Sequence, residues 1–153
     1  MNAGYAVWAF AAGALIPVMA TISGSLSRAT GSPVLAVFVL FVVGLVASAA
    51  VLLATGTQGI ATLPKLPPWL FTGGLIIAFY GLSVAVLTPR FGVGNTILFI
   101  VAAQIVTSTA IDHFGLFGAA VKPVNLMRLS GLAVLIVGVA ITQLAAKTPA
   151  ATQ

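Results

Sequence analysis

Residues 34–54 read VLAVFVLFVVGLVASAAVLLA, a run with no charged side chain and a single hydroxyl, that of Ser48. An α-helix rises about 1.5 Å per residue, so a helix of this length spans about 30 Å, the thickness of the hydrocarbon core of a bilayer. A helix on the surface of a soluble protein carries a polar face, and this run has none. We therefore predict that residues 34–54 cross a membrane.

Four further apolar runs of similar length occupy most of the remaining chain, at residues 5–23, 69–87, 93–111 and 129–146. The first run lacks the basic stretch of a signal peptide and is expected to be retained. We predict an all-α membrane protein with a five-helix transmembrane bundle. It would form a single transmembrane domain over residues 1–147, followed by a disordered tail over residues 148–153.

The composition excludes several classes of protein. Only 5% of the 153 residues are charged, and the loops left between five spans are too short for a soluble catalytic or nucleic-acid-binding domain. The net charge of +5 comes from six basic residues scattered singly along the chain. They resemble topology anchors at helix ends and do not form the clustered patch that nucleic acid requires.

The basic residues divide equally between the two membrane faces if loops alternate sides. The face of the N-terminus would carry Lys65, Lys122 and Arg128, and the opposite face Arg28, Arg90 and Lys147. The orientation of a membrane protein normally follows an excess of Lys and Arg on one side, so this equal count selects neither of the two orientations. Either another feature fixes one orientation, or copies insert both ways and pair as an antiparallel homodimer. We favour the second interpretation slightly, because five spans cannot form two equal inverted halves without a second copy.

The fourth run is the most polar. Gln104, Ser108 and Asp112 are spaced i, i+4, i+8 and therefore share one helical stripe. Gln104 and Ser108 are candidates for a substrate pathway, although a mid-span amide can also bond a neighbouring helix. Asp112, the only acidic side chain, precedes the only histidine, His113. The two could couple transport to an ion or a proton, or Asp112 could form an interfacial ion pair with Lys122 or Arg128.

Other polar residues supply weaker candidates. Pro17 should kink the first span, and residues 21–28 are expected to form a hydroxyl-rich turn after it. Thr21 and Ser25 in this segment, together with Tyr80, are candidates for the pathway. Arg28 and Arg90 share one membrane face, where they could anchor the topology or contact an anion or a lipid headgroup.

No enzyme is indicated. One histidine and one adjacent acid supply neither paired carboxylates nor a recognisable nucleophile with its base, so no catalytic residue is assigned. Metal sites need more ligands than these two residues provide, and the chain has no cysteine. We expect no cofactor and no metal.

These segments together resemble a known family. The matching residues are Gly13-Ala14-Leu15-Ile16-Pro17, Arg28, Gly31-Ser32-Pro33, Pro89-Arg90-Phe91-Gly92, Gln104, Ile111-Asp112-His113-Phe114-Gly115, Arg128 and Gly131. The succession is similar to the YdcZ-like family of bacterial inner-membrane proteins, a branch of the drug/metabolite transporter superfamily. The resemblance implies a five-helix protomer of the cell inner membrane. It also implies kinship with small multidrug resistance proteins, which work as antiparallel homodimers.

The expected function is secondary transport of a small organic solute across the bacterial inner membrane, by alternating access in a dimer. The expected partners are the lipid bilayer, the solute and a second copy or a paired homologue, and no nucleic acid. Two alternatives remain, a non-transporting membrane subunit and a lipid-handling protein.

Overall fold

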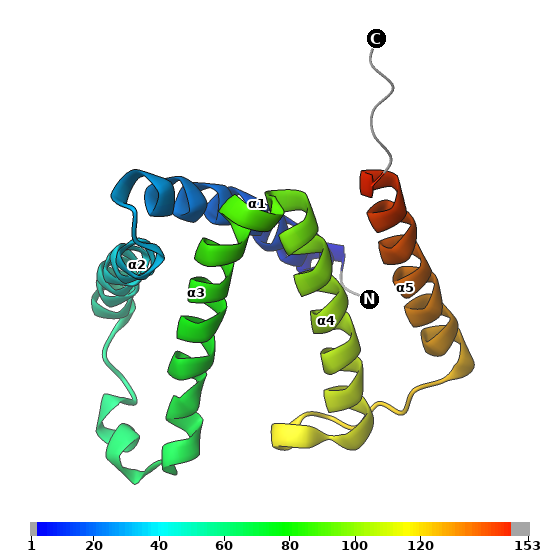
Figure 1. Ribbon diagram of the computed structural model, residues 1–153. Helices are drawn as coiled ribbons and strands as arrows, with labels where there is room; N and C mark the ends of the chain where they lie inside the picture. The colour runs from blue at the N-terminus through cyan, green and yellow to red at the C-terminus, as the bar shows by residue number, and fades with distance from the viewer. Residues whose placement is uncertain (1–2, 148–153) are drawn as a thin grey trace. The chain divides into compact units, whose positions relative to one another are not determined.

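A computed structural model describes residues 3–147 of the chain, and the predicted tail at residues 148–153 lies outside the described residues. Five long α-helices follow one another in the order α1 (Ala3–Thr30), α2 (Pro33–Thr55), α3 (Gly73–Phe91), α4 (Val93–Phe114) and α5 (Leu126–Lys147) (Figure 1). Each is long and apolar enough to cross a membrane, and residues 3–147 contain no strand. The prediction of an all-α protein with five candidate membrane-spanning helices is confirmed.

Helix α1 is longer than the sequence indicated, and the predicted turn at residues 21–28 is wrong. The helix continues past Pro17 to Thr30 and ends before Gly31, whose φ is +67°. Proline lacks the N–H that would bond the Gly13 carbonyl, and this loss does not end the helix. Separately, the Thr21 hydroxyl donates to the Pro17 carbonyl at 2.8 Å. The hydroxyl-rich segment stays helical because its small residues pack tightly against α3.

Helix α2 begins and ends at clear local signals. The Ser32 side chain accepts from the backbone N–H of Leu35 at 3.2 Å, and Pro33 occupies the first turn, where its missing N–H is not needed. Gly56, at a φ of +106°, follows the last residue of the helix. Two short 3-10 helices, η1 (Ile60–Lys65) and η2 (Pro68–Thr72), then lead into α3.

The chain divides into two compact units, each described by itself. Residues 1–93 form the first, in which α1, α2 and α3 pack against one another. Its buried residues are mostly small: Ala20, Ser23, Gly24 and Ser27 from α1, Ala36 and Val37 from α2, and Gly81, Val84, Ala85 and Thr88 from α3. A Cβ added to Gly24 would lie 3.1 Å from Thr88 Cγ2. Small side chains let helix backbones approach closely, as is usual within membranes.

The second unit, residues 94–153, contains α5 and nearly all of α4. The Gln143 amide donates to Asn95 Oδ1 at 3.0 Å and so joins the two helices. The connecting loop turns at Gly115, whose φ is +62° and whose added Cβ would lie 2.6 Å from Val121 Cγ2. Glycine is favoured there, because the left-handed backbone conformation and the close approach of Val121 both disfavour a side chain.

Candidate functional site

The middle of α4 carries an amide without a partner. Gln104 is exposed, and its side-chain amide makes no hydrogen bond with any part of the chain that the structure describes. Ser108, one turn further along, is also exposed, but its hydroxyl donates to the Ile105 carbonyl at 3.1 Å. Among Gln104, Ser108 and Asp112, Gln104 is therefore the residue whose side chain has no hydrogen-bond partner among the described residues.

The end of α4 is organised around the only acidic side chain. Arg128 lies 3.4 Å from Asp112 Oδ2, and their side chains are 43% and 34% exposed. The interfacial ion pair considered from the sequence therefore forms with Arg128. A pair this exposed stabilises a fold by only about 0–1 kcal/mol, so it can break and reform readily.

His113 is held by the loop that follows α4. Its Nδ1 accepts from the backbone N–H of Val124 at 3.1 Å, and its ring meets Phe114 edge-on with centroids 4.8 Å apart. With Nδ1 acting as the acceptor, the proton of the neutral ring sits on Nε2. The backbone N–H of Lys122 also donates to the Asp112 carbonyl at 2.8 Å, and this bond ties the loop after α4 to the end of the helix.

The remaining pathway candidates belong to the first unit. Thr21 and Ser25 are exposed on α1, and Tyr80 is half-buried on α3. Thr21 bonds within its own helix, and Ser25 Oγ accepts from the Arg28 guanidinium at 3.0 Å. Tyr80 lies on a predicted span, whereas Thr21 and Ser25, which the sequence analysis assigned to a turn, lie on helix α1.

Four buried hydroxyl residues were missed from the sequence. Ser23 and Ser27 lie on the buried face of α1, Thr88 lies on α3 and Thr96 lies on α4. Ser23 Oγ and Thr88 Oγ1 have no hydrogen-bond partner. The spacing of the small residues Ala20, Ser23, Gly24 and Ser27 was the signal available, since i, i+3, i+4 and i+7 share one helical face.

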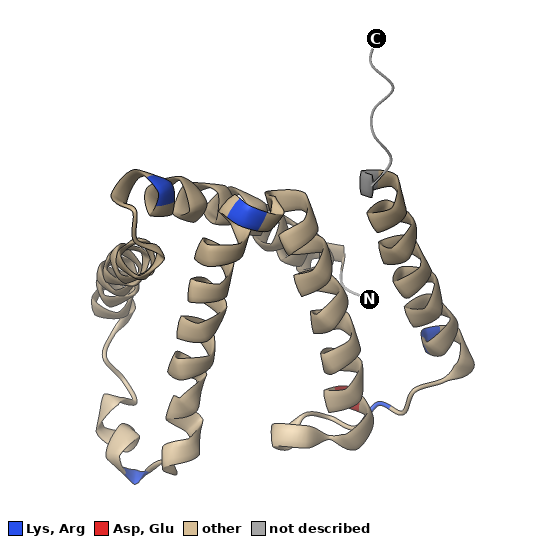
Figure 2. Ribbon diagram, in the orientation of Figure 1, with Lys and Arg blue, Asp and Glu red and all other residues tan. Residues whose placement is uncertain are grey.

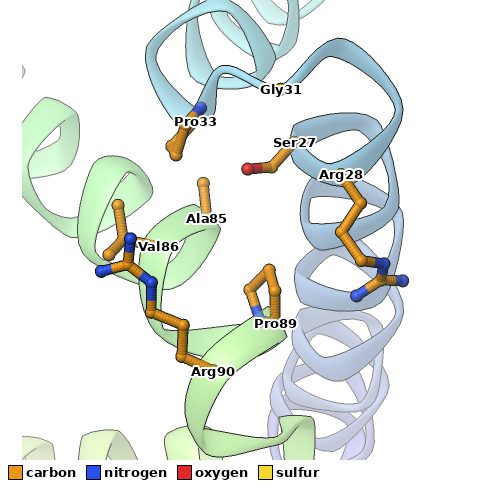
Figure 3. Close-up of a pocket in the computed structure, with 8 residues that line it drawn as sticks. All are labelled: Ser27, Arg28, Gly31, Pro33, Ala85, Val86, Pro89 and Arg90. Carbon is orange, nitrogen blue, oxygen red and sulfur yellow. The ribbon is translucent and has the colours of Figure 1, made fainter.

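Arg28 and Arg90, predicted to share a membrane face, both line one pocket of about 190 Å³ (Figure 3). The last turn of α1, the turn into α2 and the last turns of α3 form its walls. In Figure 2 the described Lys and Arg residues lie at helix ends and in loops. Both arginines line this pocket, and Figure 3 shows their guanidinium groups pointing to opposite sides of it.

Comparison with known proteins decides the family. A family model described as "putative inner membrane exporter, YdcZ" matches residues 4–141, nearly the whole chain. The chain belongs to the YdcZ family. This YdcZ-family protein is therefore a multi-pass protein of the inner membrane, and its family's description and its apolar helices fit a membrane transporter. No curated protein and no solved structure matches it.

Proposed function

We propose that this YdcZ-family protein is a secondary transporter that moves a small organic solute by alternating access in a dimer. The observation that carries the proposal is the exposed, unpartnered Gln104 amide midway along α4. An amide left in hydrocarbon without a partner costs about 2–7 kcal/mol, and lipid tails offer none. A neighbouring helix, water, a solute or a second copy of the chain must therefore contact it. A solute path along the face of Gln104 and Ser108 meets that requirement.

Two features support a dimer. Five spans cannot be divided into equal inverted halves, so a second copy would supply the symmetry that many transporters use. The six basic residues divide evenly between the expected membrane faces, so charge alone does not force one orientation. An antiparallel homodimer satisfies both features, and a paired homologue of opposite orientation would do so equally.

The pair of Asp112 and His113 is proposed to serve coupling at one mouth of the path. Because the ion pair of Asp112 with Arg128 is weak and half-exposed, Asp112 can exchange Arg128 for a cation or a proton. His113, the only histidine in the sequence, follows Asp112 directly, and histidine side chains commonly serve as proton shuttles. Tyr80, Thr21 and Ser25 are proposed to line the path elsewhere.

The solute is proposed to be neutral or weakly charged. A strongly charged solute needs a compensating charge within the membrane, and the described charged residues lie near helix ends and in loops (Figure 2). Amide and hydroxyl groups on the spans suit a solute that carries hydrogen-bonding groups.

A solute screen followed by flux measurement tests the proposal. A solute that binds only the folded protein should raise its free energy of unfolding by about 2.7 kcal/mol at a hundred times its dissociation constant. The same solute should cross sealed vesicles that contain the purified protein faster than protein-free vesicles. If solutes stabilise nothing while a second membrane protein co-purifies in fixed ratio, the protein is a non-transporting subunit and the proposal fails.

A further inference from the structure

The pocket between α1 and α3 holds a buried hydroxyl group without a partner. Ser27 is 6% exposed, and its hydroxyl points into the pocket toward Ala85 and Pro33 (Figure 3). It makes no hydrogen bond within residues 3–147. Among these residues, the fully buried hydroxyls without a partner are those of Ser23 and Thr88, so the Ser27 hydroxyl is open to the pocket and is free to donate to a ligand there.

Two guanidinium groups flank the same pocket without an acidic partner. Arg28 lies on the α1 side and Arg90 on the α3 side (Figure 3). The single acidic side chain of the protein, Asp112, is already paired with Arg128. Arg28 gives one N–H to Ser25, and a guanidinium carries five. Both guanidinium groups therefore keep unused N–H donors, and no acidic side chain balances their positive charges.

The start of α2 adds to the positive electrostatic potential at the pocket. Pro33, the first residue of α2, forms part of the pocket wall, so the positive end of a long helix dipole faces the pocket. Proline has no N–H, hence this end contributes electrostatic potential and not a hydrogen bond from Pro33. The volume of about 190 Å³ far exceeds the roughly 30 Å³ that one water occupies in the liquid.

We propose that this pocket is an oxyanion site that binds a phosphate group. Arg28 and Arg90 swing over the mouth on their flexible stems and bind the phosphate oxygens, and the Ser27 hydroxyl donates from inside. The phosphate comes either from a lipid headgroup or from a free phosphorylated solute, since both present the same oxygens. The site does not rest on the proposed transport function. A phosphate site would explain why two arginines line one pocket, which topology anchoring alone does not require.

Binding to the purified full-length protein in detergent micelles tests the site. The probes are phosphatidylglycerol doped into the micelles, with phosphatidylcholine as reference, and inorganic phosphate. The double variant Arg28→Gln/Arg90→Gln should lose about tenfold or more in affinity, because charge-assisted hydrogen bonds are the strong ones. Ser27→Ala should lose affinity by a few-fold, since it removes one neutral donor and keeps the small side chain that the packing needs.

The matched control is the double variant Lys65→Gln/Lys122→Gln, which removes the same charge from loops outside the pocket. Its affinity should stay within about twofold of that of the unaltered protein, because exposed charges act weakly at a distance. Binding of the lipid alone identifies a headgroup as the source, and binding of phosphate alone identifies a solute. If neither probe binds, or if both double variants lose affinity equally, the site is overturned. If the arginine variant does not fold, Ser27→Ala decides, and unchanged binding by it refutes the proposal.

Discussion

Replacing Gln104 with leucine is expected to lower solute flux into sealed vesicles by about tenfold or more. The amide would lose its hydrogen bond to the solute, and an unpaired polar group on the solute costs about 1–3 kcal/mol, where 1.4 kcal/mol corresponds to tenfold. Leucine inserts favourably into hydrocarbon, so the amount of folded protein should not fall. Flux is measured with the solute identified in the screen and is normalised to reconstituted protein.

The control for this variant lies on the same helix. Val106 follows Gln104 by two residues, which is about 200° around an α-helix, and it is 45% exposed. Val106→Leu should transport at nearly the rate of the unaltered protein. Flux of Gln104→Leu equal to that of Val106→Leu would remove Gln104 from the path, whatever its role in the fold.

The second large effect concerns the contact between α1 and α3. Gly24→Leu is expected to lower the free energy of unfolding by about 1–3 kcal/mol or more, which is the range for overpacking a close contact. Even the first carbon of the new side chain would lie 3.1 Å from Thr88 Cγ2 and 3.7 Å from Pro89 Cδ, and the remaining carbons have no space. Thermal unfolding in detergent measures the loss.

Gly13 supplies the matched comparison for this variant. It lies on the same helix, and a Cβ added there would meet nothing within 4 Å. Gly13→Leu should therefore unfold close to the temperature of the unaltered protein. A large loss in both variants would show that helix propensity or a contact beyond the protomer, and not the approach of α1 to α3, explains the effect at Gly24.

The sequence was sufficient for the spans because the length of an apolar run reports directly on membrane crossing. It misjudged the end of the first span, where a proline followed by hydroxyl residues indicated a turn. The structure shows that Ser23, Gly24 and Ser27 form the closest packing surface of α1, so the same residues stabilise a helix. A local pattern of small residues is ambiguous until its partner, here Thr88, is known.

The candidate site was predictable only in part, for a similar reason. Arg28 and Arg90 could be assigned to one membrane face by counting spans, and the structure places both at one pocket. The bond between Asn95 and Gln143 joins residues far apart in the chain, and no spacing rule predicts it. The sequence does not predict what contacts Gln104, because a side-chain amide bonds equally well to a helix, to water or to a solute.

Cysteine labelling along α4 tests most directly whether the Gln104 face is a water-filled path within the membrane. The protein has no cysteine, so each single substitution reacts without background. Because only the thiolate reacts and it forms in contact with water, Gln104→Cys and Ser108→Cys should react with a water-soluble maleimide about tenfold faster than Val106→Cys. Equally slow labelling at all three positions, or faster labelling at position 106, would contradict the path.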